Sequence, residues 1–142
     1  MQYRKSLNEI RRDLRPFQNY WVVLYGSYVT GTYTPRSDID VAIITKEKDP
    51  RRNRRILFKL LSKVKSDYDL RIFELLPLHI KAEVMDNYIV VFGDPLDIAE
   101  YFYFYRKIWK DMKWRYLENQ YSTYKEILDG IKRWKKIVMQ KL

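Results

Sequence analysis

The sequence contains no cysteine and only one histidine, His79, among its 142 residues. The missing cysteine excludes disulfide bonds, cysteine-ligated zinc and a thiol nucleophile. A single histidine leaves almost no material for a metal site built from several histidines or for a Ser-His-Asp triad. Chemistry in this chain must therefore rely on carboxylates, hydroxyls, backbone groups and basic side chains.

Long apolar runs are also missing. No uninterrupted run approaches the roughly 18 residues that a membrane-spanning helix needs. Residues 1–5 are followed by mixed polar sequence, whereas a secretory signal would continue into an apolar segment. We therefore expect a cytoplasmic protein that makes no contact with a membrane.

Positive charge is abundant. The chain has 28 Lys and Arg against 18 Asp and Glu, which gives a formal net charge of +10. Such a surplus favours anionic partners, including nucleotides, nucleic acids and acidic proteins, without choosing among them. The hydrophobic share of 46% is large enough to build a buried core, so a folded protein is expected.

Helical and strand patterns alternate over residues 1–96 and predict a compact α/β domain. Apolar residues at helical spacing alternate with β-prone runs that end at Gly or Pro. The predicted helices cover residues 2–15 and 54–64 and a short stretch after Pro77, and the predicted strands cover residues 20–25, 38–45, 68–74 and 88–92.

Residues 97–142 follow a different pattern and predict a helical extension. This segment has no proline, and its apolar residues recur every three or four positions, as in one long helix or a pair broken near Gly130. It holds 11 Lys or Arg, 6 Asp or Glu and 11 aromatic residues. We expect these aromatics to pack on the sheet domain and on another helix or a second subunit, with single-stranded nucleic acid as the alternative.

Two aspartates open the second predicted strand. Asp38 and Asp40 are two residues apart, so their side chains point to the same face of a strand. Two like charges held together are costly unless a cation neutralises them. Oxygen ligands without nearby His or Cys indicate a hard divalent ion, most simply Mg²⁺.

A phosphate-compatible turn precedes the aspartates. Gly26 and Ser27 stand where the first predicted strand ends. Glycine permits close backbone approach, and free N–H groups with a hydroxyl suit a phosphate. Together with the carboxylates, this turn is typical of a site that places a nucleoside triphosphate beside its metal.

A third carboxylate is expected if two metal ions act on one phosphoryl group. Asp69 is the best candidate because it opens the next predicted strand, which can neighbour the strand of Asp40. Glu74, on the other face of that strand, is the alternative ligand, although a solvated strand-end glutamate is its simpler interpretation.

The motif of Gly26-Ser27, ten intervening residues and Asp38-Ile39-Asp40 resembles the minimal nucleotidyltransferases of the DNA polymerase beta superfamily. Gly31 and Ser37 match that signature as well, and the resemblance spans roughly residues 8–94. It implies an α/β (α+β) fold in which a small mixed sheet is flanked by helices, here followed by the C-terminal helical extension.

The resemblance also implies site residues and a reaction. Asp38, Asp40 and Asp69 would hold Mg²⁺, while Gly26, Ser27 and Ser37 would contact the nucleotide. The reaction would move a nucleoside monophosphate from an NTP, most simply ATP, to a hydroxyl, with pyrophosphate leaving. Asp69 is the aspartate best placed in the sequence to take the proton of the acceptor.

One position departs from the family pattern. Many members carry a basic residue where this chain has Thr30. Other basic residues could replace it: Arg36, Arg71, or the cluster of Arg51, Arg52, Arg54 and Arg55, whose simpler interpretation is a solvated helix face. The departure leaves open a catalytically weak module that binds a nucleotide, a partner or nucleic acid on the same fold.

The resemblance finally implies a partner. Minimal nucleotidyltransferases are often paired with a helical HEPN-type protein in toxin–antitoxin modules, where they neutralise the toxin by adenylylating a tyrosine. The C-terminal helices would then bind this partner or form a homodimer. Nothing in the residues themselves identifies the acceptor.

Overall fold

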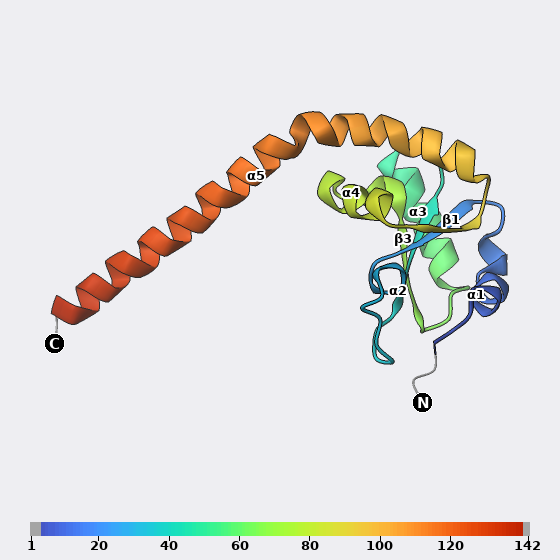
Figure 1. Cartoon of the computed structure of the whole chain (residues 1–142), viewed down its shortest axis with the longest axis horizontal. Coiled ribbons are helices and arrows are strands. Elements are labelled where there is room, and N and C mark those ends of the chain that lie inside the picture. Colours follow the sequence, from blue (N-terminus) through green and yellow to red (C-terminus); the bar gives the residue numbers. More distant parts are fainter. Residues whose placement is uncertain (1–3, 141–142) are drawn as a thin grey trace. The chain divides into compact units, whose positions relative to one another are not determined.

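The computed structural model describes residues 4–140 and contains a four-stranded sheet with the strand order β3-β2-β1-β4 (Figure 1). Helices lie on both sides of this sheet. The elements are α1 (Leu7–Asp13), η1 (Arg15–Phe17), β1 (Trp21–Tyr25), α2 (Ser27–Thr30), β2 (Ile39–Ile44), α3 (Pro50–Leu61), β3 (Tyr68–Ile72), η2 (Phe73–Leu75), α4 (Leu78–Asp86), β4 (Ile89–Phe92) and α5 (Pro95–Gln140).

The sheet is mixed. β1 runs antiparallel to both β2 and β4, whereas β2 and β3 are parallel. The parallel connection is made through α3, which provides the crossover that two parallel neighbours require. The expected small mixed sheet flanked by helices, with a C-terminal helical extension, is confirmed.

One face of the sheet forms the main hydrophobic core. Alternate residues of each strand point to this face, because successive strand side chains project to opposite sides. Helices α1 and α3 cover it. The core contains Ile10 of α1, Leu14 directly after it, Phe17 of η1, Val22 and Leu24 of β1, Ile39, Val41 and Ile43 of β2, Leu60 of α3, and Tyr68 and Leu70 of β3.

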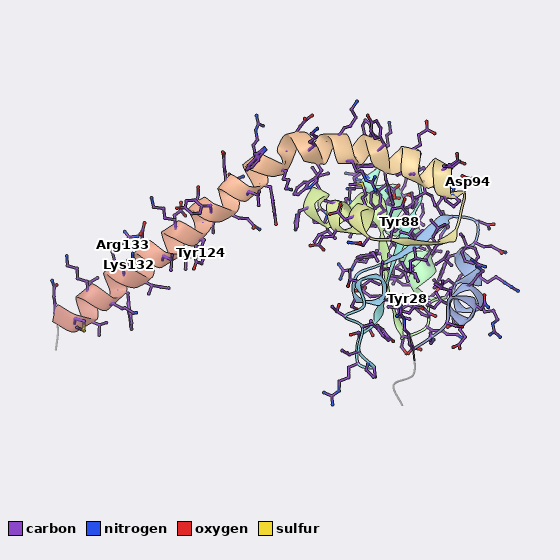
Figure 2. All side chains as sticks on the ribbon, viewed as in Figure 1. Tyr28, Tyr88, Asp94, Tyr124, Lys132 and Arg133 are labelled. Atoms are coloured by element: carbon purple, nitrogen blue, oxygen red, sulfur yellow. The ribbon has the colours of Figure 1, made fainter. Side chains whose placement is uncertain are left out.

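The opposite face is covered by α4 and by the first turns of α5. The ring of Phe73 lies 4.9 Å from that of Phe102, and Trp21 meets Tyr101 at 5.8 Å between ring centroids. Asp94 caps the start of α5, where its carboxylate accepts from the backbone N–H of Leu96 (Figure 2). The aromatic rings of Trp21, Phe73, Tyr101 and Phe102 cover one end of this opposite face, and polar residues occupy its other end.

A carboxylate network ties α1 to the start of β3. The Asp13 carboxylate accepts hydrogen bonds from Lys5 at 2.8 Å, from Lys65 at 2.7 Å and from the Tyr68 hydroxyl at 2.6 Å. The backbone carbonyl of Lys5 in turn accepts from the buried hydroxyl of Tyr28 in α2. The segment around α1 therefore connects α2 with β3.

Several predicted boundaries are wrong, for local reasons. The predicted strand 68–74 ends at Ile72, and Phe73–Leu75 is a 3₁₀ turn. The predicted helix 54–64 begins earlier, at Pro50, because the Asp49 side chain caps it and proline suits a first helical position.

At the C-terminal end, α5 is a single helix that continues through Gly130. The first compact unit of the chain ends at Lys107, and the second begins at Ile108. The expected domain boundary near residue 96 coincides with the start of α5 and lies before the end of the first compact unit. Within residues 4–140, no helix has the length and apolar character to cross a membrane.

We expect Asp13→Asn to lower the free energy of unfolding by about 1–3 kcal/mol at about pH 7, because Tyr68 and two lysines lose a charged acceptor. Burial of Asp13 raises its pKa, but the hydrogen bonds from Lys5, Lys65 and Tyr68 outweigh burial and lower the pKa. The stabilisation is therefore present above the unfolded pKa of about 4 and is lost as the pH falls toward the folded value.

Urea unfolding at several pH values measures this difference. The gap between the wild type and Asp13→Asn should be constant above about pH 4 and should shrink below it. Asp111→Asn, an exposed change on α5, serves as the matched control. A gap that widens on acidification would contradict the assignment.

Candidate active site

A one-turn helix follows β1 and makes the first part of the site. Gly26 adopts a φ of 74°, and its carbonyl accepts from the N–H groups of Val29 and Thr30, both at 3.1 Å. Gly31, with a φ of 85°, closes the turn. The backbone N–H groups of Ser27 and Tyr28 stand at the start of this turn, where a helix favours negative charge.

Glycine is required at position 26 for a second reason. A Cβ atom on Gly26 would overlap the carboxylate oxygen Oδ2 of Asp40. The positive φ adds strain for any other residue. The turn and the carboxylate are thus in direct contact, which joins the two halves of the sequence motif.

The sheet register brings the carboxylates together. Asp40 on β2 is the Cα partner of Asp69 on β3 and of Tyr25 on β1. Partners in register project to the same face, and neighbouring strands lie about 4.8 Å apart. The prediction that the strands of Asp40 and Asp69 are neighbours is confirmed.

The electrostatics of the site reflect this crowding. Burial raises the pKa of Asp40, and the charges of Asp69 and Asp38 raise it further, while Arg71 acts in the opposite direction. Burial and the charges of Asp40 and Asp69 raise the pKa of Tyr25 to about 12. Arg71 pairs with Asp69 at 3.4 Å, and this contact raises the pKa of the guanidinium.

A pocket of about 360 Å³ opens between the turn and the end of α4. Its lining contains no Lys or Arg and includes two further carboxylates. The lining residues are Tyr25, Gly26, Ser27, Thr30 and Asp40 on one side and Glu83, Asp86 and Asn87 on the other. Sequence reasoning missed the second group, because residues more than 40 positions beyond Asp40 carry no motif that links them to it.

The structure shows which of the basic residues that could replace a basic side chain at position 30 lie near the carboxylates. Arg71 lies beside the carboxylates, through its pair with Asp69. The arginine cluster begins α3, next to Asp49 and after the other end of β2. Arg52 pairs there with Glu47 and Asp49. The cluster is exposed, so its interpretation as a solvated helix face is confirmed.

Ser37 and Asp38 lie in the loop before β2. The Ser37 hydroxyl accepts from the backbone N–H of Thr34 and bonds to its hydroxyl, which closes a turn. Asp38 is exposed and precedes the first residue of β2. Neither lines the pocket in this structure, so Asp38 contributes to the site through its charge on Asp40.

Glu74 is placed away from these carboxylates. It accepts from the backbone N–H groups of Thr45 at 3.1 Å and Lys46 at 2.9 Å, and from the Tyr101 hydroxyl at 2.6 Å. Thr45 follows the far end of β2, about 16 Å from Asp40 along an extended strand. The interpretation of Glu74 as a solvated glutamate is wrong, because these bonds hold it half-buried.

The donor set fits a hard divalent ion in its chemistry. Asp38, Asp40 and Asp69 offer only carboxylate oxygens. Burial and, after it, the charges of Asp69 and Asp38 raise the pKa of Asp40, and a bound cation would offset both effects. Within residues 4–140, no three His, Asp or Glu side chains already stand as a metal-binding group.

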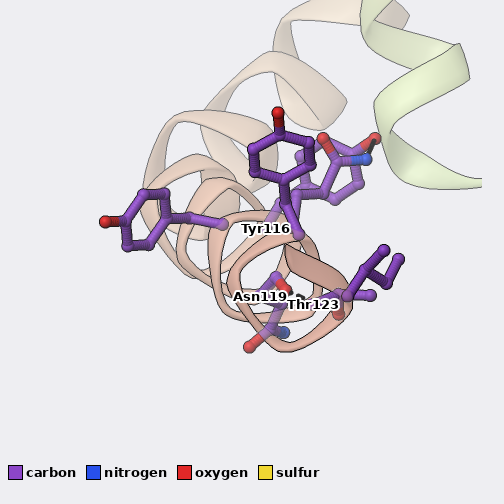
Figure 3. Close-up of a pocket in the computed structure, with 7 residues that line it drawn as sticks. Tyr116, Asn119 and Thr123 are labelled. Carbon is purple, nitrogen blue, oxygen red and sulfur yellow. Dashed lines mark hydrogen bonds between the residues drawn. The ribbon is translucent and has the colours of Figure 1, made fainter. Parts of the chain in front are cut away.

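A second hollow lies on α5 alone. Figure 3 shows Tyr116, Asn119 and Thr123 around it, and all of its lining residues come from this one helix. Five of the seven lining residues lie within positions 119–124. None of its lining residues carries a carboxylate, and none of them also lines the pocket beside Asp40.

Comparison with known proteins gives consistent results. The profile of the nucleotidyltransferase domain matches residues 4–91. The proposed protein adenylyltransferase MJ1547 of Methanocaldococcus jannaschii is 43% identical over 107 residues, which cover 75% of this chain and 83% of that protein. A second protein of that organism with the same proposed activity, MJ0141, is 29% identical over 88 residues, 62% of this chain and 82% of its own.

Two solved structures share the fold. A chain from the crystal structure of a toxin–antitoxin with AMP-PNP has a TM-score of 0.54 and 25% identity, and the match covers 77% of this chain and 94% of the other. A chain from a mutant of the toxin–antitoxin MntA-HpeT has a TM-score of 0.53 and 23% identity over the same shares.

We expect Gly26→Ala to destabilise the fold more than Gly31→Ala. Gly31 lies in the left-handed helical region, where alanine adds roughly 1–2 kcal/mol of strain. Gly26, with a φ of 74° and a ψ of −147°, lies in a region that is essentially restricted to glycine, so alanine is strained more there. Only at Gly26 does the new Cβ meet Asp40, whereas nothing lies within 4 Å of the position at Gly31. Thermal unfolding of the two variants measures the added cost at Gly26, which combines the contact with Asp40 and the less favourable backbone. Equal loss of stability in both would show that the contact is unimportant.

Proposed function

The chain belongs to the nucleotidyltransferase family, and from this we propose that it transfers AMP from ATP to a hydroxyl of a partner protein. One observation carries the proposal: the Gly26–Ser27 turn, Asp40 and Asp69 occupy the ends of three adjacent strands. The strand order β1, β2, β3 places Asp40 between the turn and Asp69. This is the order in which leaving group, transferred group and acceptor must stand for an in-line reaction.

The turn serves the triphosphate. Gly26 and Ser27 line the pocket beside Asp40, so the N–H groups at the start of α2 and the Ser27 hydroxyl are available to phosphate oxygens there. Gly26 lets the backbone approach the carboxylate closely, so phosphate oxygens can be held next to the carboxylates. The pocket wall of Glu83, Asp86 and Asn87 then faces the rest of the nucleotide and supplies hydrogen-bond acceptors, as well as the amide donor of Asn87.

Asp38, Asp40 and Asp69 are the residues that would hold Mg²⁺. Bound there, the ion would supply the positive charge that the pocket lining lacks, because that lining contains carboxylates and no Lys or Arg. Arg71 remains beside Asp69 and adds one fixed positive charge on the β3 side. This arrangement supports activity despite Thr30.

The transfer itself follows from these positions. The acceptor oxygen forms a bond to the α-phosphorus, the bond from that phosphorus to the pyrophosphate oxygen breaks, and pyrophosphate leaves on the side of Gly26 and Ser27. Asp69, on the opposite side of Asp40, takes the proton of the acceptor hydroxyl. No histidine is needed for this step.

Two findings support ATP and a protein acceptor. The relatives MJ1547 and MJ0141 bear the name of protein adenylyltransferases. The similar chain of 25% identity was crystallised in a toxin–antitoxin complex with AMP-PNP. By the family resemblance the partner here is a HEPN-type toxin, the acceptor is one of its tyrosines, and this chain acts as the antitoxin.

The second compact unit offers a surface for that partner. From Tyr124 onward, apolar side chains recur at alternating spacings of three and four along one side of α5. Ile131 is 46% exposed and Trp134 is 64% exposed. Tyr124, Lys132 and Arg133 project from the same part of the helix (Figure 2). A helical partner packs on such a stripe, with basic side chains beside it for acidic groups. A second copy of this chain is the alternative occupant.

Asp40→Asn should abolish AMP transfer without weakening the fold. The wild-type Asp40 carboxylate is repelled by Asp69 and Asp38, so its neutralisation removes an unfavourable interaction and should keep or raise the free energy of unfolding at about pH 7. Transfer of label from [α-³²P]ATP to the HEPN-type partner measures activity, and urea unfolding measures stability. We expect a loss of roughly 10²-fold or more in transfer.

Asp111→Asn is again the control and should retain full transfer. Unchanged transfer in Asp40→Asn would sink the role assigned to that carboxylate. Capture of the partner by a wild-type protein that transfers no label would identify the binding module as the correct function.

Ile131→Glu should weaken partner binding by about tenfold or more, because a charge would enter a desolvated contact. Ser122→Glu is the matched control, since nine residues place position 122 on the opposite side of the helix. Calorimetric titration with the HEPN-type protein gives the affinities. If neither change matters to the partner, ultracentrifugation of both variants tests whether the stripe joins two copies of this chain instead.

A further inference from the structure

The Tyr25 side chain is a polar group of the site that the reaction described above does not use. Tyr25 is the last residue of β1, and the Gly26–Ser27 turn follows it directly. It is the Cα partner of Asp40 across the antiparallel pair of β1 and β2. Partners in register project to the same face of a sheet. Tyr25 therefore stands beside Asp40 on the face opposite the main hydrophobic core, to which its neighbour Leu24 belongs.

The hydroxyl of Tyr25 opens on the pocket beside Asp40. Tyr25 is only 8% exposed, and it lines this pocket of about 360 Å³. Burial and neighbouring charges act on its hydroxyl, but no residue within 4–140 shares a hydrogen bond with it. Every fully buried side-chain nitrogen or oxygen of residues 4–140 has a hydrogen-bond partner. The unpaired hydroxyl is therefore the part of the side chain that reaches the pocket.

The surroundings of this hydroxyl suit a ligand that brings an acceptor. A phenol is protonated at neutral pH, since its ordinary pKa is about 10, so it offers an O–H donor. A largely buried donor without a partner costs free energy, because it has lost hydrogen bonds to water. The charges that act on the hydroxyl come from Asp40, Asp69 and Glu83, with Arg71 acting in the opposite direction. A bound molecule that places an oxygen at this point satisfies the donor.

The position of the hydroxyl indicates which oxygen of the nucleotide it meets. In the proposed reaction, pyrophosphate leaves on the side of the Gly26–Ser27 turn, so the α-phosphate lies next along the pocket, at Asp40. Tyr25 is the register partner of Asp40 and directly precedes the turn, so it stands beside the same phosphate. Glu83 and Asp86 on the other wall are acceptors and suit the hydroxyl and amino donors of the nucleoside, whereas phosphate oxygens need donors.

From these contacts we infer that the Tyr25 hydroxyl donates a hydrogen bond to a non-bridging oxygen of the α-phosphate of ATP. This inference rests on the proposed AMP transfer. The hydrogen bond holds the α-phosphate beside Asp40 while the acceptor oxygen bonds to its phosphorus and the bond to pyrophosphate breaks. The phenol keeps its proton throughout, so Asp69 remains the group that takes the proton of the acceptor. A neutral donor here supports an anion in a lining that contains no Lys or Arg.

Tyr25→Phe removes the hydroxyl and keeps the ring. The free energy of unfolding should stay the same or rise, because the hydroxyl has no partner within residues 4–140. Affinity for AMP-PNP with Mg²⁺, measured by calorimetry without a partner protein, should fall roughly tenfold, since a hydrogen bond to a charged group is lost. Tyr103→Phe is the matched control, because Tyr103 is 59% exposed on α5, and it should change neither quantity. Equal affinities of the wild type and Tyr25→Phe would overturn the inference.

Sulfur substitution tests which oxygen accepts the hydrogen bond. Each of the two diastereomers of ATPαS replaces one non-bridging α-oxygen by sulfur, which is a weaker hydrogen-bond acceptor. One diastereomer should bind to the wild type roughly fivefold more weakly than ATP, and this penalty should largely disappear in Tyr25→Phe, because the hydroxyl and the oxygen act as a pair. The penalty of the other diastereomer should be the same in both proteins. Equal penalties in both proteins for both diastereomers would show that Tyr25 does not contact the α-phosphate.

The two proposals fail in different ways. With the HEPN-type partner as acceptor, Tyr25→Phe should lower kcat/KM for label transfer roughly 10²-fold. Transfer by the wild type with an unaffected Tyr25→Phe variant would refute the contact with the α-phosphate and leave the function intact. A wild type that transfers no label, yet binds AMP-PNP more tightly than Tyr25→Phe, would refute the function and leave the contact intact.

Discussion

The parallel pairing of β2 with β3 is the constraint on which the rest of the site depends. Its register sets Asp40 opposite Asp69, two like charges that would otherwise separate. The same register sets Val41 opposite Leu70 on the buried face. A slip of one residue would move apolar side chains to the wrong face. Hydrophobic burial on one side of the sheet thus holds the carboxylates together on the other.

The neighbouring carboxylates of Asp40 and Asp69 lower the stability of the fold at the site. Contacts outside the site hold the strands that carry them. The Asp13 network fixes the start of β3 through Tyr68, one residue before Asp69. Tyr28 of α2 bonds to the carbonyl of Lys5 in the same N-terminal segment. One segment therefore positions the turn that would hold phosphate and the strand that carries the third carboxylate. Contacts that take no part in the reaction therefore hold the parts of the site in place.

Two pockets lie beside the strands that carry Asp40 and Asp69. One is bounded by the Gly26–Ser27 turn and carboxylates of α4, and the other is an apolar groove at the edge of β3. Asp40 lines the first pocket, and its register partner Asp69 lines the second. The second compact unit lies in α5, where exposed apolar and basic side chains share one helix and suit a macromolecular partner.

The sequence by itself determined the family, because the Gly-Ser turn and the spacing to Asp38 and Asp40 form a local pattern, and the mixed sheet followed as what that family resemblance implies. Only the tertiary structure shows that Asp69 lies beside Asp40 and that Glu74 does not, because pairing partners are needed to tell which end of the sheet each residue occupies. It likewise assigned Arg71 to the site and Glu83 and Asp86 to the pocket wall. Contacts between distant segments follow from strand order and register, which no local pattern records.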